Sequence, residues 1–161
     1  MIPNSIRERP MLALHKEILR ARLEDREPRV FRHEDGEHGL WYTRCAYAVK
    51  WPAQDLYPDL KVLSIFEVFD AYDRADEMLQ LYAHPLQIKL PSGIVAQQLT
   101  TEDGSHTHID KRYRNLFPLS HYSYWYDGDP RHPIYCADRD SGELLGVILP
   151  LSPKNVQQAR S

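Results

Sequence analysis

Residues 119–149 have the sequence LSHYSYWYDGDPRHPIYCADRDSGELLGVIL, and this stretch decides the fold class. It contains three short runs rich in aromatic and aliphatic residues, at 119–126, 134–137 and 144–149. The turn sequences DGDP and SG separate these runs. Turn-forming dipeptides between short apolar runs are typical of antiparallel strands joined by tight turns. The stretch therefore predicts a meander of three strands.

The same pattern extends toward the N-terminus. Alternating apolar and polar residues predict a hairpin whose return strand, 40–51, has one aromatic-rich face. Turn residues at 91–93 and at 103–104 bound further strands. The predicted strands of this part of the chain are 29–33, 40–51, 61–69, 86–90, 94–100 and 106–112.

Two segments have helical spacing. The first starts at Pro10, which suits the first turn of a helix, and runs to about Arg26 before Pro28. The second starts at Asp70, an N-cap residue, and runs to Ala83. The predicted buried stripe of the first helix is Met11, Leu12, His15, Ile18, Leu19 and Leu23.

Together these elements predict an α+β fold, with a mostly antiparallel sheet of about seven to nine strands and two amphipathic helices. The chain has 161 residues, of which 42% are hydrophobic and 27% are charged, as in ordinary globular domains. We expect a single domain over residues 1–153, followed by a polar tail over 154–161. The sequence is aromatic-rich, with 10 Tyr, 3 Trp and 4 Phe against 7 Gly.

The formal net charge is −3, which provides no global field for nucleic acid. The charges are uneven, because residues 1–32 are mainly basic and residues 55–77 are mainly acidic. This asymmetry is suited to steering a protein partner, or a second copy of the chain, into contact. The 2 cysteines form no CxxC pair, and no apolar run is long enough to span a membrane. We therefore expect a soluble, cytoplasmic protein without a membrane partner.

One short motif has the residue types of a metal site. His106, His108 and Asp110 alternate along a predicted strand, so that two imidazoles and a carboxylate share one face. Such a set suits a divalent metal, and it resembles the opening of the HxHxDH motif of metallo-β-lactamase-type hydrolases. Lys111 stands where that motif has its final histidine. The resemblance implies a small metal-dependent hydrolase or nuclease, whereas the polar residues before it indicate a solvent-facing strand edge.

A second group of residues combines basic side chains with aromatic rings. Single-stranded nucleic acid is bound by such groups, because the bases of the nucleic acid stack on rings and its phosphates meet cations. Rings on both faces of the strand 119–126 equally indicate a buried strand or a protein interface. The residues of this predicted binding surface are Lys111, Arg112, Tyr113, Arg114, Tyr122, Tyr124, Trp125 and Arg131.

The sequence contains no GxSxG elbow, glycine-rich phosphate loop, HExxH helix or EF-hand loop. We therefore predict a non-enzymatic binding or accessory domain that acts through a protein–protein interface, without a cofactor. Its partner is another protein or a second copy of the chain. The alternatives are the metal-dependent enzyme, with a divalent cation at the histidine motif, and a nucleic-acid-binding domain that uses the basic and aromatic strand.

Overall fold

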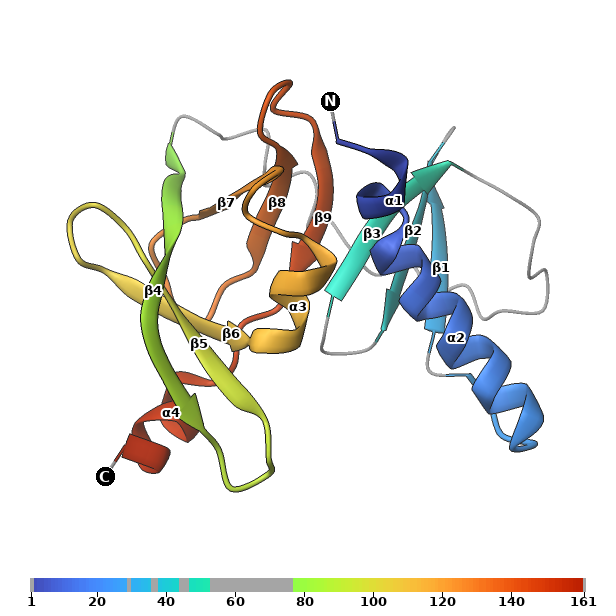
Figure 1. Ribbon diagram of the computed structural model, residues 1–161, viewed down its shortest axis with the longest axis horizontal. Helices are drawn as coiled ribbons and strands as arrows, with labels where there is room; N and C mark the ends of the chain where they lie inside the picture. Colours follow the sequence, from blue (N-terminus) through green and yellow to red (C-terminus); the bar gives the residue numbers. More distant parts are fainter. Residues whose placement is uncertain (1, 29, 36–37, 44–46, 53–76, 161) are drawn as a thin grey trace.

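The computed structural model describes residues 2–28, 30–35, 38–43, 47–52 and 77–160 (Figure 1). The N-terminal elements are α1 (Asn4–Arg7), α2 (Arg9–Leu23), β1 (Val30–Asp35), β2 (His38–Thr43) and β3 (Tyr47–Pro52). The remaining elements are β4 (Leu79–Lys89), β5 (Val95–Thr100), β6 (His106–Asp110), α3 (Lys111–Leu116), β7 (Tyr122–Tyr126), β8 (Ile134–Asp138), β9 (Leu144–Ile148) and α4 (Pro153–Arg160).

The described strands form one continuous sheet in the order β1-β2-β3-β9-β8-β7-β4-β5-β6, and every neighbouring pair is antiparallel. The sheet curls, so that β6 comes close to the chain that leaves β9 (Figure 1). There the Leu151 N–H donates to the His108 carbonyl at 2.9 Å. The Thr107 hydroxyl donates to the Pro130 carbonyl at 3.2 Å. The α+β class with an antiparallel sheet is confirmed.

The main core lies inside this curl and extends under α2. Three tyrosines of β7 occupy its centre and are 0–1% exposed. Phe117 packs edge-on against the Tyr122 ring, with the ring centroids 5.4 Å apart. A side chain at position 146 would collide with the Phe117 ring, so Gly146 on β9 leaves the space that this ring occupies. The buried tyrosines are Tyr122, Tyr124 and Tyr126.

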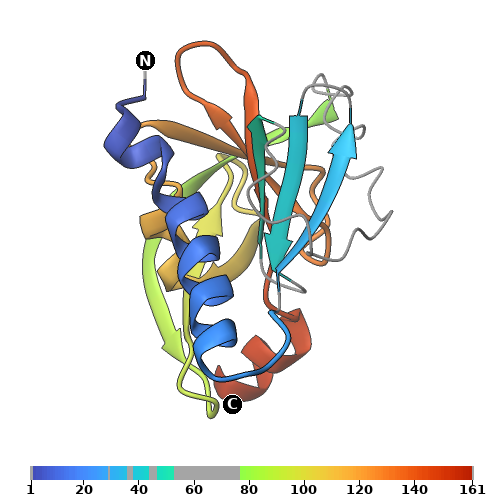
Figure 2. The same ribbon diagram turned by 90° about the vertical axis from the view of Figure 1, so that its right-hand side faces the viewer.

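Helix α2 confirms the first predicted helix, but its buried face differs from the predicted one. Met11, Leu14 and Ile18 are at most 2% exposed and face the core. The helix lies against β1–β3, and its other side is at the surface of the molecule (Figures 1 and 2). Three residues of the predicted stripe are therefore on the wrong side, namely Leu12 (51% exposed), Leu19 (61%) and Leu23 (82%).

The prediction of a single return strand over residues 40–51 is wrong. The structure has two strands there, β2 and β3. β2 and β3 pair antiparallel with each other, and Thr43 stands opposite Tyr47. Two strands that turn back on each other do not present one continuous face, so the predicted row of alternating residues is broken between them. Cys45 lies outside the described residues.

The second predicted helix, 70–83, is wrong over its described end. Residues 79–83 belong to β4, where Leu79 pairs with Tyr126 and Leu81 pairs with Tyr124 of β7. The ladder with β5 is irregular between Ala83 and Gln87, around Pro85, which has no N–H to donate. The predicted strand 61–69 and the start of this helix lie outside the described residues.

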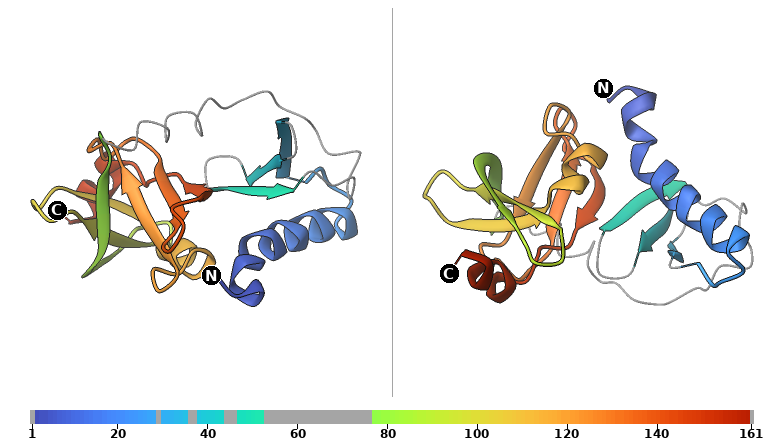
Figure 3. Two further views of the ribbon diagram at one scale, coloured as in Figure 1. Left: turned by 90° about the horizontal axis from the view of Figure 1, so that it is seen from above. Right: turned by 60° about the horizontal axis from the view of Figure 1, so that its bottom comes forward.

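The C-terminal residues were expected as a polar tail, and instead they form α4. Val156 on this helix is 2% exposed and packs with Leu90 and Ala96 in a second cluster. Figure 3 shows α4 beneath the curled strands, at the opposite end of the molecule from α2. Among the described residues, no helix is long and apolar enough to cross a membrane.

Candidate functional site

The basic part of the predicted binding surface is helical, which corrects the predicted strand 106–112. β6 ends at Asp110, whose carboxylate accepts the Arg112 backbone N–H at 3.0 Å and so caps α3. The Arg112 guanidinium returns to the same carboxylate at 2.6 Å. Lys111, Arg112, Tyr113 and Arg114 therefore point around a helix instead of alternating along a strand.

The aromatic part of the predicted surface is mostly core. Tyr122 and Tyr124 are 1% and 0% exposed, so the prediction that they bind a partner is wrong. The Tyr124 hydroxyl donates to the Phe117 carbonyl inside the protein. Trp125 is half-buried, and its indole N–H donates to Ser123 at 2.9 Å. The tyrosine rings are buried because they lie in the main core, where Phe117 packs against Tyr122.

Arg131, the last residue of the predicted surface, lies in the loop between β7 and β8. Its guanidinium pairs with Asp129 at 2.8 Å. The cations of α3, the buried rings of β7 and this loop residue do not form one surface. Within α3 the Arg112 guanidinium lies over the Tyr113 ring, 6.0 Å from its centroid, but Tyr122 and Tyr124 are buried and offer no ring on which a base could stack.

The structure brings together the two histidines of the His106, His108 and Asp110 motif, but not the aspartate. The His106 and His108 rings meet edge to face, with their centroids 5.6 Å apart. Asp110 is engaged with Arg112 and with the start of α3. In the part of the chain that the structure describes, no three His, Cys, Asp or Glu side chains are grouped closely enough to hold a metal ion. The three motif residues thus do not make a ligand set.

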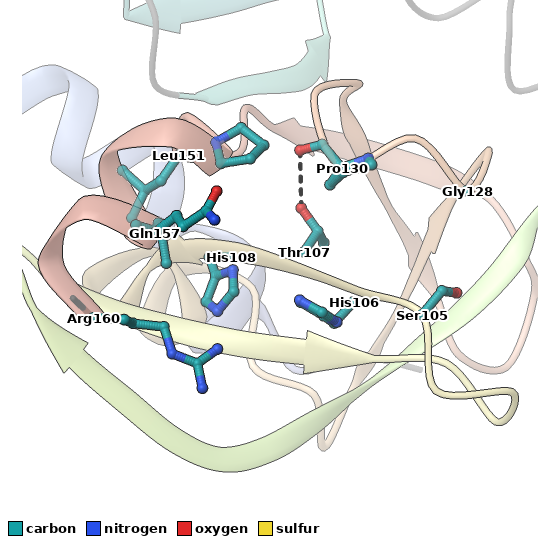
Figure 4. Close-up of a pocket in the computed structure, with 11 residues that line it drawn as sticks. Ser105, His106, Thr107, His108, Gly128, Pro130, Leu151, Gln157 and Arg160 are labelled. Carbon is teal, nitrogen blue, oxygen red and sulfur yellow. Dashed lines mark hydrogen bonds between the residues drawn. The ribbon is translucent and has the colours of Figure 1, made fainter.

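A cavity of about 510 Å³ lies beside the two histidines. One wall is β6, another is α4, and the loop that follows β7 closes a third side (Figure 4). Leu151, Pro153 and Val156 supply apolar surface, whereas Arg160 supplies a cation. No carboxylate is among the residues that line it, which are Ser105, His106, Thr107, His108, Gly128, Pro130, Leu151, Pro153, Val156, Gln157 and Arg160.

His108 is the unusual residue of this cavity. It is 7% exposed, and its Nε2 is buried without a hydrogen-bond partner among the described residues. Burial, together with the smaller effects of the nearby His106 and Arg160, lowers the pKa of this imidazole to about 4. The ring is therefore neutral at pH 7. An unpaired buried polar atom costs about 1–3 kcal/mol of stability, so its presence calls for an explanation.

A second unusual feature is the outer side of α2. Leu12, Leu19 and Leu23 are separated by seven and four residues, which aligns them along one edge of the helix. Each is more than half exposed. Lys16 and Arg20 lie along one side of this row and Arg22 along the other. We call these three leucines the outer leucine row.

Sequence reasoning missed both features for different reasons. The outer leucine row was visible as helical spacing, but it was merged with the buried stripe, which has its own spacing of Met11, Leu14 and Ile18. Arg160 gave no signal, because nothing local predicts that the end of the chain folds back beside β6.

Comparison with family models, with curated proteins and with solved structures finds no match to this chain.

Proposed function

We propose that this protein is a binding domain that acts through a protein–protein interface on the outer side of α2. The observation that carries the proposal is the outer leucine row. Leucines scattered singly on a surface are common, but three on one helix edge make an apolar strip in which Leu19 and Leu23 lie one turn apart. Such strips are what an amphipathic partner helix covers, with apolar side chains spaced at three and four residues.

The charges beside the row indicate which kind of partner fits. Lys16 and Arg20 give one side of the strip a positive charge. A partner helix with apolar residues flanked by glutamates or aspartates would match both features, because opposite charges at the rim raise association rates and fix register. A second copy that docked through its own α2 would instead bring like charges together along the strip. The partner is therefore an acidic amphipathic helix of another protein.

The test uses a synthetic helical peptide with leucines at its a and d positions and glutamates on both sides. We expect it to bind the full chain, measured by fluorescence anisotropy, with an affinity that falls as salt rises. Replacing Leu19 and Leu23 together with glutamine removes most of the apolar contact, and we expect binding to weaken at least about tenfold. The same double variant keeps its unfolding midpoint, because the two side chains are exposed.

A matched control is Leu79→Gln, which removes a leucine that is 39% exposed on β4 and leaves α2 intact. The proposal is overturned by equal binding of the double variant, or by equal binding of a peptide with lysines in place of the glutamates. It is also overturned if phosphatidylserine vesicles bind α2 and the acidic peptide does not. A dimer in sedimentation that the double variant dissociates would replace the acidic partner with a second copy.

A further inference from the structure

The cavity beside β6 is independent of the interface proposed for α2, since the two share no residue. We infer that this cavity binds a small organic anion, whose carboxylate or phosphate oxygens lie between His108 and Arg160 and whose apolar body lies against α4. Figure 4 shows both side chains on the cavity, His108 from β6 and Arg160 from the last turn of α4.

The charge of the lining selects an anion. Arg160 is a permanent cation with N–H groups that suit carboxylate and phosphate oxygens. No lining residue is an Asp or a Glu, so nothing in the wall repels such a ligand or neutralises the arginine from within the cavity. The ring of His106 lies at the same wall, 5.6 Å from that of His108.

His108 supplies the polar contact that fixes the anion. A neutral imidazole carries one N–H donor, and Nε2 has no described hydrogen-bond partner that would compete for it. Nε2 is shielded from solvent in this conformation. A half-turn about the Cβ–Cγ bond exchanges Nε2 with Cε1, and it breaks no described hydrogen bond at Nε2. An incoming oxygen would then satisfy the one orphaned atom of the site.

The apolar wall and the size of the cavity point to an organic ligand instead of a bare ion. Leu151, Pro153 and Val156 form one side, and about 510 Å³ is large enough for a ring or a short chain behind the anionic group. The loss of solvent around this part of the ligand adds to the affinity that the two polar side chains provide.

The experiment titrates the full chain with benzoate, with phenyl phosphate and with neutral benzamide, and follows the His108 imidazole resonances by NMR. We expect benzoate or phenyl phosphate to shift these resonances and benzamide to shift them much less. The comparison of the two anions distinguishes a carboxylate site from a phosphate site. Binding that is as strong for benzamide as for the anions, or no shift with either anion, overturns the proposal.

Three variants tie the binding to the named groups, and calorimetry with the same anions reads them. We expect Arg160→Gln and His108→Leu each to weaken binding by roughly tenfold or more, because a hydrogen bond to a charged group is lost. Arg139→Gln removes the same charge from the β8–β9 turn, outside the cavity, and should leave binding unchanged. If His108→Leu does not fold, Arg160→Gln alone decides, because Arg160 is exposed. Equal loss in Arg160→Gln and Arg139→Gln would reduce the effect to net charge and overturn the site.

Discussion

Strands β7 and β6 both place side chains with polar ring atoms in the interior. The two strands differ in whether these atoms have hydrogen-bond partners. β7 has β4 on one side and β8 on the other, and the hydroxyls of Tyr124 and Tyr126 bond to Phe117 and Ser105. β6 is the last strand of the sheet and pairs only with β5. On β6, His108 is as deeply placed as a core residue, yet its Nε2 has no described partner.

This difference indicates that the polar ring atoms of β7 stabilise the fold, whereas His108 on β6 is available for binding. On β7 the polar ring atoms of Tyr124, Trp125 and Tyr126 are hydrogen-bonded within the fold, so the aromatic richness of this strand requires no ligand to account for it. On β6 the unpaired nitrogen lowers stability, and it does so at the wall of a cavity. Polar groups that are costly to the fold and belong to residues at the wall of a cavity are candidates for binding.

The largest effect should come from the centre of β7. Tyr124→Ala removes a ring that is 0% exposed and leaves a cavity, so we expect a loss of about 3–5 kcal/mol in the free energy of unfolding. Urea unfolding followed by tryptophan fluorescence measures this loss. Leu23→Ala on the exposed edge of α2 is the reference, and it should change the same free energy by less than about 0.5 kcal/mol. A similar loss in both variants would contradict the burial described for β7.

The next largest effect is the decrease of stability at acidic pH, which involves His108 on β6. The unfolded chain protonates His108 near its ordinary pKa of 6.5, whereas the folded chain does so only near 4. Protons therefore favour the unfolded chain over this range, and stability falls as pH decreases through it, by up to about 3 kcal/mol. Urea midpoints between about pH 7 and pH 4 measure the slope. His108→Leu should flatten it, and an unchanged slope would show that other groups cause it.

The smallest effect compares the two strands directly and has opposite signs. Tyr124→Phe removes the donor to the Phe117 carbonyl, so we expect a loss of about 1 kcal/mol in stability. His108→Leu removes a buried atom that has no described partner, so we expect a gain of about 1 kcal/mol. Thermal unfolding under identical conditions measures both. Changes of the same sign would remove the distinction between β7 and β6.

Much of the fold could be predicted from local sequence patterns, whereas the candidate sites could be predicted from them only in part. The strands of 119–149 and their turns were predictable because alternation and turn dipeptides act over a few residues. His106 and His108 were singled out by their spacing, but for a metal and not for a cavity with Arg160. The burial of Tyr124 and the exposure of Leu19 could not be predicted from spacing, because both depend on which elements pack against them.

The sequence by itself determined the antiparallel α+β class, the helix that starts near Pro10, and the turns that end each strand of the meander. These depend on backbone preferences and on periodicity, which are local properties. Only the tertiary structure decided that residues 79–83 are a strand, since pairing with β7 outweighs their helical propensity. It alone decided that α4 folds back beside β6 and leaves His108 buried at a cavity, because long-range packing joins segments that no local pattern connects.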